Sequence, residues 1–293
     1  MAMHIGHVAM RVTDLERSVA HALSTLDLMV TSSTPQTVLL TSNAKHHELQ
    51  LIAADQPGLD HVGLEVETEA ELDAVRNRLV SVGARILSET PQEEGIDQSI
   101  RTVGPAGVVF EIYTGMTRSP LALSNVLRPL ARKLGHVTMF SDYKTELEDF
   151  ILNVLGFRVS DRWGQYATWM RCDADHHGLA VGKTSSGSRL HHYAFELEGW
   201  GAIGYYADRI SRHGQQFLWG PGRHGPGFNI FTYLPDPEGA IVEVYTDLLR
   251  IDDDKAYNAV DWADEPRAMN LWGPLMPSGW DDFGVPILDP TSS

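Results

Sequence analysis

The sequence predicts an α+β fold in which one domain occurs twice in tandem. Segments with strand and helix character alternate along the chain, and the motifs of the first half return roughly 130 residues later. The stretch GVVFEIYT at 107–114, for example, matches GAIVEVYT at 239–246. Two histidines and a glutamate recur at steps of 54 and 50 residues, then 56 and 51: His7, His61 and Glu111, followed by His136, His192 and Glu243. A period this long indicates a duplicated domain rather than a solenoid.

Five elements are expected in the first half, in the order strand, helix, strand, helix, strand: 7–10, 14–28, 60–64, 69–82 and 107–114. Apolar residues at helical spacing support the first helix. We assign residues 1–117 to an N-terminal domain and residues 118–133, which Pro120 and Pro129 punctuate, to a linker.

The second half repeats this order and adds a hairpin: 136–140, 146–155, 191–195, 200–213, 228–234 and 240–246. Aromatic and β-branched residues fill the first hairpin strand, and the sequence PDPEG that follows is typical of a turn. We assign residues 134–250 to a C-terminal domain and 251–293 to a tail. The tail contains Trp262, Trp272 and Trp280, which we expect to pack on the body.

Composition excludes several classes of partner. The chain has 23 basic and 39 acidic residues, a net charge of −16, which argues against binding to nucleic acid or an anionic membrane. Cys172 is the single cysteine, so no intrachain disulfide is possible, which fits a reducing cytoplasm. No apolar run approaches the ~20 residues of a membrane helix, and no secretory signal opens the chain. We therefore expect a cytoplasmic protein.

Glu243 is the first functional signal. It interrupts an apolar strand, where an unpaired carboxylate is costly, although an edge strand facing water would also explain it. Two histidines and one carboxylate on separate strands match the facial triad of non-heme Fe(II) oxygenases, which leaves coordination positions open for substrate and O₂. His136 and His192 complete such a triple with Glu243, and its recurrence in both halves strengthens the interpretation.

Five stretches carry a family resemblance: LGHVTMF, YATWMRCDADHHGLAV, SRLHHYAFE, GPGRHGPGFNIFTYLPDPEGAIVEVYTD and LWGPLMPSGW. The chain resembles the type I extradiol ring-cleavage dioxygenases of the vicinal oxygen chelate superfamily, which include catechol 2,3-dioxygenases. The resemblance implies that each domain pairs two βαβββ modules into an open, barrel-like sheet around a cavity. It also implies that the N-terminal domain is structural, the C-terminal domain catalytic, and the protein a homo-oligomer, with a tetramer in first place.

The same resemblance assigns roles by position. The metal ligands would be His136, His192 and Glu243, holding Fe(II), with Mn(II) as the other candidate. His177 would be the acid–base histidine, and His224 and Tyr233 would hold the substrate oxygens. Trp169 matches a residue of the substrate pocket. The expected reaction inserts O₂ into a catechol beside its two hydroxyls and gives a hydroxymuconic semialdehyde.

Several alternatives stay open. The choice of His177 over His176, and of His192 over His191, depends on the family register alone, since either partner would also fit a polar surface position. His21 and His213, on predicted helices, are interpreted as solvated. The same superfamily also contains metal-dependent isomerases and epimerases of the glyoxalase type, and metal-free proteins that only bind small molecules.

The substrate is not determined by these motifs. Relatives that take carboxylated catechols have an arginine five residues before the position of His224, where this chain has Trp219. Arg267 in the tail partly matches a second carboxylate-binding arginine of those enzymes. Trp219 and Arg267 are therefore candidate substrate contacts. Homoprotocatechuate itself is not the expected substrate.

The first half keeps His7, His61 and Glu111, and His46 lies fifteen residues before His61. At the positions that correspond in the repeat to His224 and Tyr233, the first half has Gln92 and Arg101 instead. Metal-ligating histidines depend on hydrogen-bond partners that fix their rings, and we expect the first half to lack them. We therefore interpret this triple as a remnant of duplication and expect one iron per chain.

Overall fold

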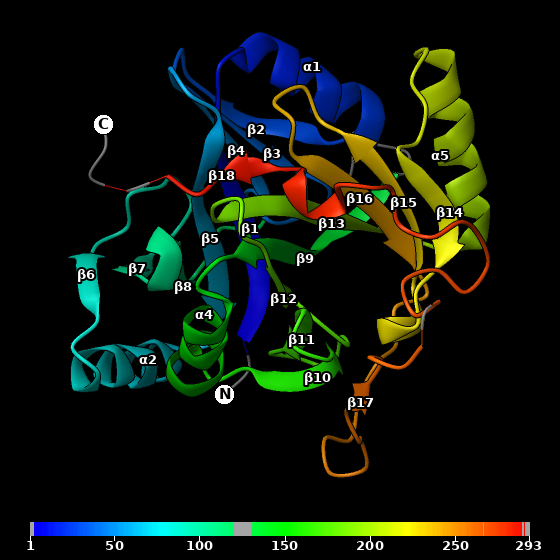
Figure 1. Ribbon diagram of the computed structural model, residues 1–293. Helices are drawn as coiled ribbons and strands as arrows, with labels where there is room; N and C mark the ends of the chain where they lie inside the picture. Colours follow the sequence, from blue (N-terminus) through cyan, green and yellow to red (C-terminus); the bar gives the residue numbers. More distant parts are fainter. Residues whose placement is uncertain (1–2, 120–129, 266, 289, 291–293) are drawn as a thin grey trace.

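The computed structural model describes residues 3–119, 130–265, 267–288 and 290, which form two open mixed sheets with helices on their outer faces (Figure 1). The first sheet has eight strands in the order β2-β3-β4-β1-β5-β8-β7-β6. Along its main path the second has the order β14-β15-β16-β13-β9-β12-β11-β10-β17. Neither sheet closes into a barrel. The predicted α+β fold with two tandem domains is confirmed.

The elements of the first half follow the order strand, helix and three strands, twice over: β1 (Met3–Val12), α1 (Leu15–Leu26), β2 (Met29–Ser33), β3 (Thr37–Thr41), β4 (Leu49–Ala53), then β5 (Gly58–Val66), α2 (Glu69–Ser81), β6 (Arg85–Ser88), β7 (Gln98–Val103), the 3₁₀ turn η1 (Pro105–Gly107) and β8 (Val109–Thr114). Each module is one βαβββ unit. The first strands of the two modules, β1 and β5, pair antiparallel at the centre of the sheet.

The second half repeats this plan: β9 (Ala131–Ser141), α4 (Lys144–Phe150), the π-helical turn η2 (Ile151–Leu155), β10 (Arg158–Trp163), β11 (Ala167–Arg171), β12 (Leu179–Lys183), then β13 (Arg189–Leu197), α5 (Trp200–Arg212), β14 (Trp219–Arg223), the 3₁₀ turn η3 (Pro226–Phe228), β15 (Ile230–Pro235) and β16 (Ile241–Thr246). Strand β9 begins inside the predicted linker 118–133. Residues 120–129 of that linker lie outside the described residues.

Helix boundaries follow local chemistry. Asp14 caps α1 by accepting a hydrogen bond from the backbone N–H of Arg17, and Thr68 caps α2 in the same way through Glu71. Helix α1 ends at Leu26, two residues before the predicted end, because the next residue, Asp27, is left-handed with a φ of 60°. His21 on α1 is buried, which contradicts its predicted solvation, whereas His213 is exposed.

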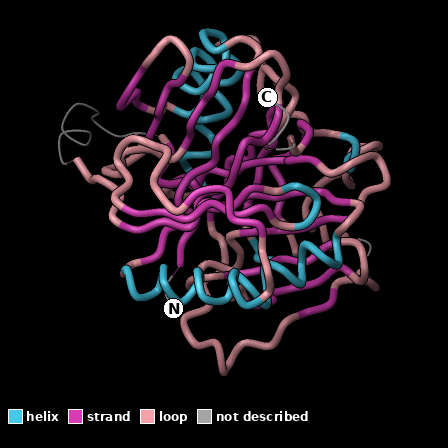
Figure 2. Tube along the Cα trace, turned by 90° about the vertical axis from the view of Figure 1, so that its left-hand side faces the viewer, coloured by secondary structure: helices cyan, strands magenta, loops and turns pink. Residues whose placement is uncertain are grey.

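The two halves share one core. Figure 2 shows the strands of both sheets gathered in the middle of the molecule, with helices outside them. One continuous hydrophobic cluster includes Val8 of β1 and Val137 of β9. On the outside, Arg209 of α5 donates to the carbonyl of Leu23 in α1, and Arg78 of α2 donates to the carbonyl of Val154 in η2. The duplicated domains are therefore packed together.

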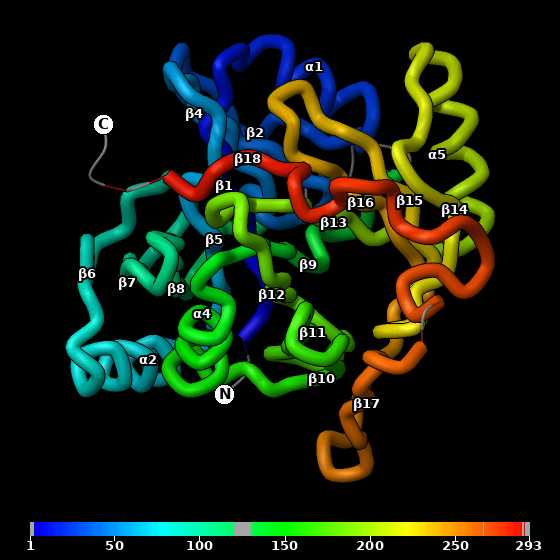
Figure 3. Tube along the Cα trace, viewed as in Figure 1, coloured from blue at the N-terminus to red at the C-terminus, as the bar shows by residue number. Residues whose placement is uncertain are grey.

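The tail lies over the second sheet, as the orange and red part of Figure 3 shows. It adds two short strands and one 3₁₀ turn, η4 (Trp280–Asp282). Strand β17 (Val260–Asp261) pairs with β10, and strand β18 (Val285–Pro286) pairs with β13. Trp280 is buried and Trp262 partly buried, as predicted, but Trp272 is half exposed. Within the described residues, no helix is long and apolar enough to cross a membrane.

Candidate metal centre and its cavity

Three neighbouring strands in the second sheet bring the predicted ligands together. His136 lies on β9, His192 on β13 and Glu243 on β16. The Nε2 atom of His136 is 3.0 Å from Oε2 of Glu243, and Nε2 of His192 is 3.3 Å from the same oxygen. All three side chains are buried. Two imidazole nitrogens and a carboxylate oxygen converge on one point, which fits a divalent metal ion.

The electrostatics favour the protonation states that a metal needs. Burial holds the pKa of His192 well below its usual range, and the neighbouring His191 and His136 add to this effect. Burial also pushes the pKa of Glu243 upwards, but attraction to His136 and hydrogen bonds outweigh it, so that this pKa is lowered. A neutral imidazole and an ionised carboxylate are the forms that bind metal ions.

Hydrogen bonds orient the ligands. Asn229 donates from Nδ2 to Oε1 of Glu243 at 2.9 Å, which leaves Oε2 directed at the histidines. His191 donates from Nε2 to the carbonyl of Trp280 at 2.9 Å, so its Nδ1 is an acceptor. His192 therefore donates its Nδ1–H to His191 across 2.7 Å, which leaves the Nε2 lone pair of His192 free for a metal. His191 is buried and orients His192, and it is not the surface residue that the sequence allowed.

His177 lies beside the metal position. Its ring centroid is 4.4 Å from that of His136. The Nδ1 atoms of His177 and His176 are 3.0 Å apart, and Nε2 of His176 is 3.2 Å from Oδ2 of Asp161. The carboxylate favours a proton on Nε2 of His176, so that His177 donates from Nδ1 and its Nε2 is a lone pair. Both histidines are buried, which excludes a surface position for His176.

His224 and Tyr233 form a hydrogen-bonded pair on the other side of the site. Nδ1 of His224 donates to the carbonyl of Met269 at 2.6 Å, so its Nε2 accepts from the Tyr233 hydroxyl at 3.0 Å. Burial lowers the pKa of His224 to about 4 and raises the pKa of Tyr233 well above its usual range. A neutral imidazole and a neutral phenol therefore face the metal position.

A cavity of about 330 Å³ opens onto all these groups, a size suited to a small aromatic molecule. Trp169, which the resemblance assigns to the substrate pocket, is part of its wall. Most of the other wall residues are apolar: Phe140, Trp163, Tyr166, Ala167, Ala180, Val181, Met269, Met276 and Trp280. The last three belong to the tail, and sequence reasoning missed them because no periodic pattern connects the tail with the sheet.

Two predicted substrate contacts do not line this cavity. Trp219 is buried behind Tyr233, where the two rings stack with centroids 5.6 Å apart, and its indole N–H donates to the carbonyl of Pro274. Arg267 is exposed and donates to the carbonyl of Gly273. Neither side chain is directed at the metal position. Lys183, an exposed residue, lies at the cavity wall.

The first half also brings its triple together. Nε2 of His7 is 2.9 Å from Nε2 of His61, and Oε2 of Glu111 lies within 3.6 Å of both nitrogens. Sequence reasoning missed the fourth member, Glu93, and placed Gln92 at its position. The ring that packs on His7 is that of His47, with centroids 4.7 Å apart, and not that of His46.

Comparison with known proteins supports the predicted family. The family model of the Glyoxalase/Bleomycin resistance protein/Dioxygenase superfamily matches residues 4–112 and 133–244. Metapyrocatechase 2 of Cupriavidus necator is 27% identical over 297 residues, covering 94% of this chain and 91% of that protein. The manganese-dependent 2,3-dihydroxybiphenyl 1,2-dioxygenase of Geobacillus genomosp. 3 is 26% identical over 299 residues, covering 94% of this chain and 95% of that protein.

A solved structure shows the same fold. Homoprotocatechuate 2,3-dioxygenase from Arthrobacter globiformis superposes with a TM-score of 0.89 at 24% identity, covering 99% of this chain and 93% of the other. The family match covers most of both halves, and the resemblance inferred from the motifs is confirmed. The chain belongs to the glyoxalase/bleomycin resistance protein/dioxygenase superfamily.

Proposed function

We propose that the protein is an extradiol dioxygenase that uses a divalent metal ion, Fe(II) in first place, to open a catechol ring beside its two hydroxyls. The observation that carries this proposal is the convergence of His136, His192 and Glu243 on one wall of a cavity that His177, His224 and Tyr233 also face. The names of the two sequence relatives, which are dioxygenases acting on catechol-type rings, agree with it.

The three ligands would hold the metal through two nitrogens and one oxygen and leave its other positions to the cavity. A metal bound there would chelate both catechol oxygens, favour their deprotonation and mediate electron transfer to O₂. Iron and manganese both suit this ligand set, and one relative is manganese-dependent by name. We place Fe(II) first because the ligand set matches the facial triad of Fe(II) oxygenases.

His177 is suited to move a proton during the reaction. Burial holds the pKa of His177 well below its usual range, and nearby imidazoles add to this effect. The ring is therefore neutral at pH 7 and first acts as a base that takes a proton from the substrate. The same ring would later return this proton to an oxygen atom as a general acid.

His224 and Tyr233 position the substrate. Their hydrogen bond fixes both rings, and the tyrosine hydroxyl lies across the strand pair from Glu243, with which it is in register. A substrate oxygen beside this pair would meet two groups that carry no charge of their own. The buried position of both groups keeps water away from the reacting carbon.

The cavity favours an apolar ring substituent. Apart from the groups at the metal position and from Thr138, Lys183 and Asp281, its wall is aromatic and aliphatic or glycine. A carboxylate on the substrate would meet Lys183 only at the exposed rim, because Trp219 and Arg267 are directed elsewhere. Burying an unpaired carboxylate is costly. We therefore propose neutral, apolar-substituted catechols as substrates.

The test is a panel of catechol, 3-methylcatechol, 2,3-dihydroxybiphenyl and homoprotocatechuate with protein loaded anaerobically with Fe(II) or Mn(II). We expect one O₂ consumed per ring opened, a yellow semialdehyde product, and kcat/KM at least tenfold lower for homoprotocatechuate than for the best neutral catechol. Opening between the hydroxyls would exclude the extradiol reaction. Substrate isomerisation without O₂ uptake would identify a glyoxalase-type enzyme, and binding without turnover a sequestering protein.

A further inference from the structure

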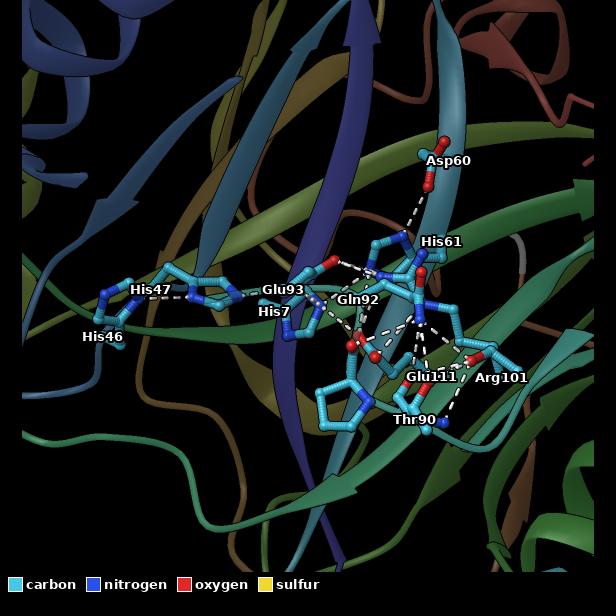
Figure 4. Close-up of polar contacts among 12 residues, drawn as sticks. His7, His46, His47, Asp60, His61, Thr90, Gln92, Glu93, Arg101 and Glu111 are labelled. Atoms are coloured by element: carbon cyan, nitrogen blue, oxygen red, sulfur yellow. Dashed lines mark hydrogen bonds and ion pairs between the residues drawn. The ribbon is translucent and has the colours of Figure 1, made fainter. Parts of the chain in front are cut away.

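A second cluster of metal-ligating side chains lies in the first half, outside the proposed catalytic site. We call it the first-half cluster: His7, His61, Glu93 and Glu111. Figure 4 shows these side chains directed at one point, with Arg101 beside them and Asp60 behind His61. Three of the four residues are on strands β1, β5 and β8, and Glu93 is on the loop before β7. The histidines and Glu111 are fully buried, and the Glu93 side chain is 2% exposed.

The separations within the cluster are those of ligands around one metal ion. Bonds of about 2.1 Å at angles between 90° and 110° place neighbouring ligand atoms roughly 3.0–3.4 Å apart. The Nε2 atom of His7 is 2.9 Å from Nε2 of His61 and 3.2 Å from Oε2 of Glu93. Oε2 of Glu111 is 3.6 Å and 3.5 Å from these two nitrogens. The corresponding distances in the second half are 3.0 and 3.3 Å.

The hydrogen bonds around the cluster leave lone pairs pointing inwards. His61 donates from Nδ1 to Oδ1 of Asp60 at 2.7 Å, so the Nε2 atom of a neutral His61 carries a lone pair. That lone pair faces Oε1 of Glu93 at only 2.7 Å. Two acceptors at this distance repel each other unless a cation lies between them. Either a metal ion or an additional proton on Nε2 must therefore occupy this position.

Asp60 supplies the hydrogen-bond partner that we expected the first half to lack. It also accepts a hydrogen bond from Arg11 at 2.8 Å, which holds the carboxylate in place behind His61. A carboxylate that accepts from a ligating histidine orients the ring and increases its basicity. The expectation of a metal-free remnant depended on the absence of this support, and the structure removes that reason for His61, although Nδ1 of His7 has no hydrogen-bond partner among the described residues.

Glu93 and Arg101 take the places that His224 and Tyr233 have in the second half. Arg101 is in register with Glu111 as Tyr233 is with Glu243. Its Nη2 atom is 2.6 Å from Oε1 of Glu93 and 3.3 Å from Oε2 of Glu111. The catechol-facing pair of the catalytic half is thus replaced by a fourth ligand and by a cation that bonds to both carboxylates.

We propose that the first-half cluster is a closed structural site for a divalent transition-metal ion, and that this ion is Zn²⁺. The ligands would be His7, His61, Glu93 and Glu111. Four protein ligands complete a tetrahedral shell, whereas the three-ligand set of the second half leaves positions open for substrate. Arg101 donates to both carboxylates, and its Nη2 atom is also 3.4 Å from Nε2 of His61. The proposal does not depend on the reaction in the second half, because it concerns stability and metal content only.

The test is a Zn²⁺ titration of chelator-treated protein by calorimetry, with metal content checked by elemental analysis. We expect two equivalents bound by the parent and one by His192→Ala. In the His192→Ala background, Glu93→Gln should weaken the remaining site at least 100-fold, while Glu94→Gln, a change at the neighbouring exposed glutamate, should leave it intact. Zn²⁺ should also raise the Tm of His192→Ala, since a ligand of the folded state stabilises it.

Asp60→Asn serves as a second variant if Glu93→Gln does not fold, and it should weaken Zn²⁺ binding about 10–100-fold. A folded His192→Ala protein that binds no Zn²⁺ would overturn the proposal. The cluster would then be an ion-pair network in which Arg101 and a second proton on His61 replace the metal. Ring cleavage by His7→Ala should persist in either case, so failure here leaves the proposed function intact.

Discussion

His177 and His192 are both buried imidazoles near one point, but their hydrogen bonds give them different tasks. His192 donates from Nδ1 to His191 and directs Nε2 at Oε2 of Glu243. The His177 ring is tilted by 53° against that of His136 at the cavity wall, and no ion pair links His177 with Glu243 in the described residues. Removing the first should remove a metal bond, whereas removing the second should remove a proton path.

We therefore expect His192→Ala to lose its metal in the second half, and His177→Phe to keep both metal and substrate binding but to lose roughly 10²–10⁴-fold in kcat. Metal analysis, substrate titration under anaerobic conditions and steady-state kinetics measure the three quantities. His213→Phe, a change at an exposed histidine that does not line the cavity, is the control. Wild-type turnover by His177→Phe would transfer the acid–base role to another group.

Trp219 provides a second test at this scale. The sequence suggested that an arginine at this position would recruit carboxylated substrates. The structure places Trp219 at 4% exposure between Tyr233, Phe231 and Trp280, with ring centroids 4.6–5.6 Å away. Trp219→Arg would bury a charge and remove aromatic packing, so we expect a loss of roughly 3 kcal/mol or more in unfolding free energy.

Urea unfolding measures this loss, and Trp219→Phe should lose less than half as much because it keeps an apolar ring. A stable Trp219→Arg protein with a higher kcat/KM for homoprotocatechuate would show that the side chain reaches the cavity after all. The same result would restore the substrate contact predicted from the sequence.

Among the secondary-structure elements, helix α1 carries a buried histidine, His21. Burial lowers the pKa of His21 to about 4, with Arg17 adding to the effect. The folded state therefore binds a proton less tightly than the unfolded state, whose histidine pKa is about 6.5. Stability from this group is fully present above about pH 6.5 and is lost as the pH falls towards 4.

We expect the free energy of unfolding to fall by roughly 3 kcal/mol between pH 7 and pH 4 on account of His21 alone, at about 1.4 kcal/mol per pKa unit. His21→Leu should remove this part of the pH dependence, and the exposed His213→Leu should not. Urea denaturation at several pH values measures both. Identical slopes for the wild-type protein and His21→Leu would mean that His21 reaches water in solution.

At the scale of the whole molecule, Glu48 connects the two halves. Its buried carboxylate accepts from the backbone and hydroxyl of Ser42, from the amide of Asn43 and, across the interface, from the backbone N–H of Leu134 at 3.0 Å. A buried carboxylate with four donors fixes the start of β9 against the first sheet. The contact therefore aligns the second half of the chain on the first.

We expect Glu48→Ala to lower the free energy of unfolding by roughly 2–4 kcal/mol, because each buried donor left without a partner costs about 1–3 kcal/mol. Calorimetry should show one transition in the wild-type protein, since both halves share a core, and a broader or split transition in the variant. Glu146→Ala, on an exposed face of α4, is the control. Equal effects of both changes would show that the Glu48 contact does not couple the halves.

The sequence by itself determined the repeat, the four principal helices and the His-His-Glu sets that the structure brings together. These features are local or periodic: caps such as Asp14, apolar spacing along a helix, and a carboxylate in an apolar strand. The duplication also repeats a close contact between a backbone glycine and a tyrosine ring. Gly6 lies against Tyr113 and Gly135 against Tyr245, each glycine just before the first histidine of its triple, and neither position has room for a Cβ. Such signals lie within a few residues of each other, where the chain's own geometry relates them.

Only the tertiary structure decided which residue of a neighbouring pair faces a site. Glu93 rather than Gln92, and His47 rather than His46, depend on loop lengths and β-bulges that shift a strand by one residue and reverse its faces. The cavity wall supplied by Met269, Met276 and Trp280, and the position of Trp219 behind Tyr233, come from packing between distant segments. These contacts leave no periodic trace in the sequence, because their geometry is set by how the tail and the second sheet meet.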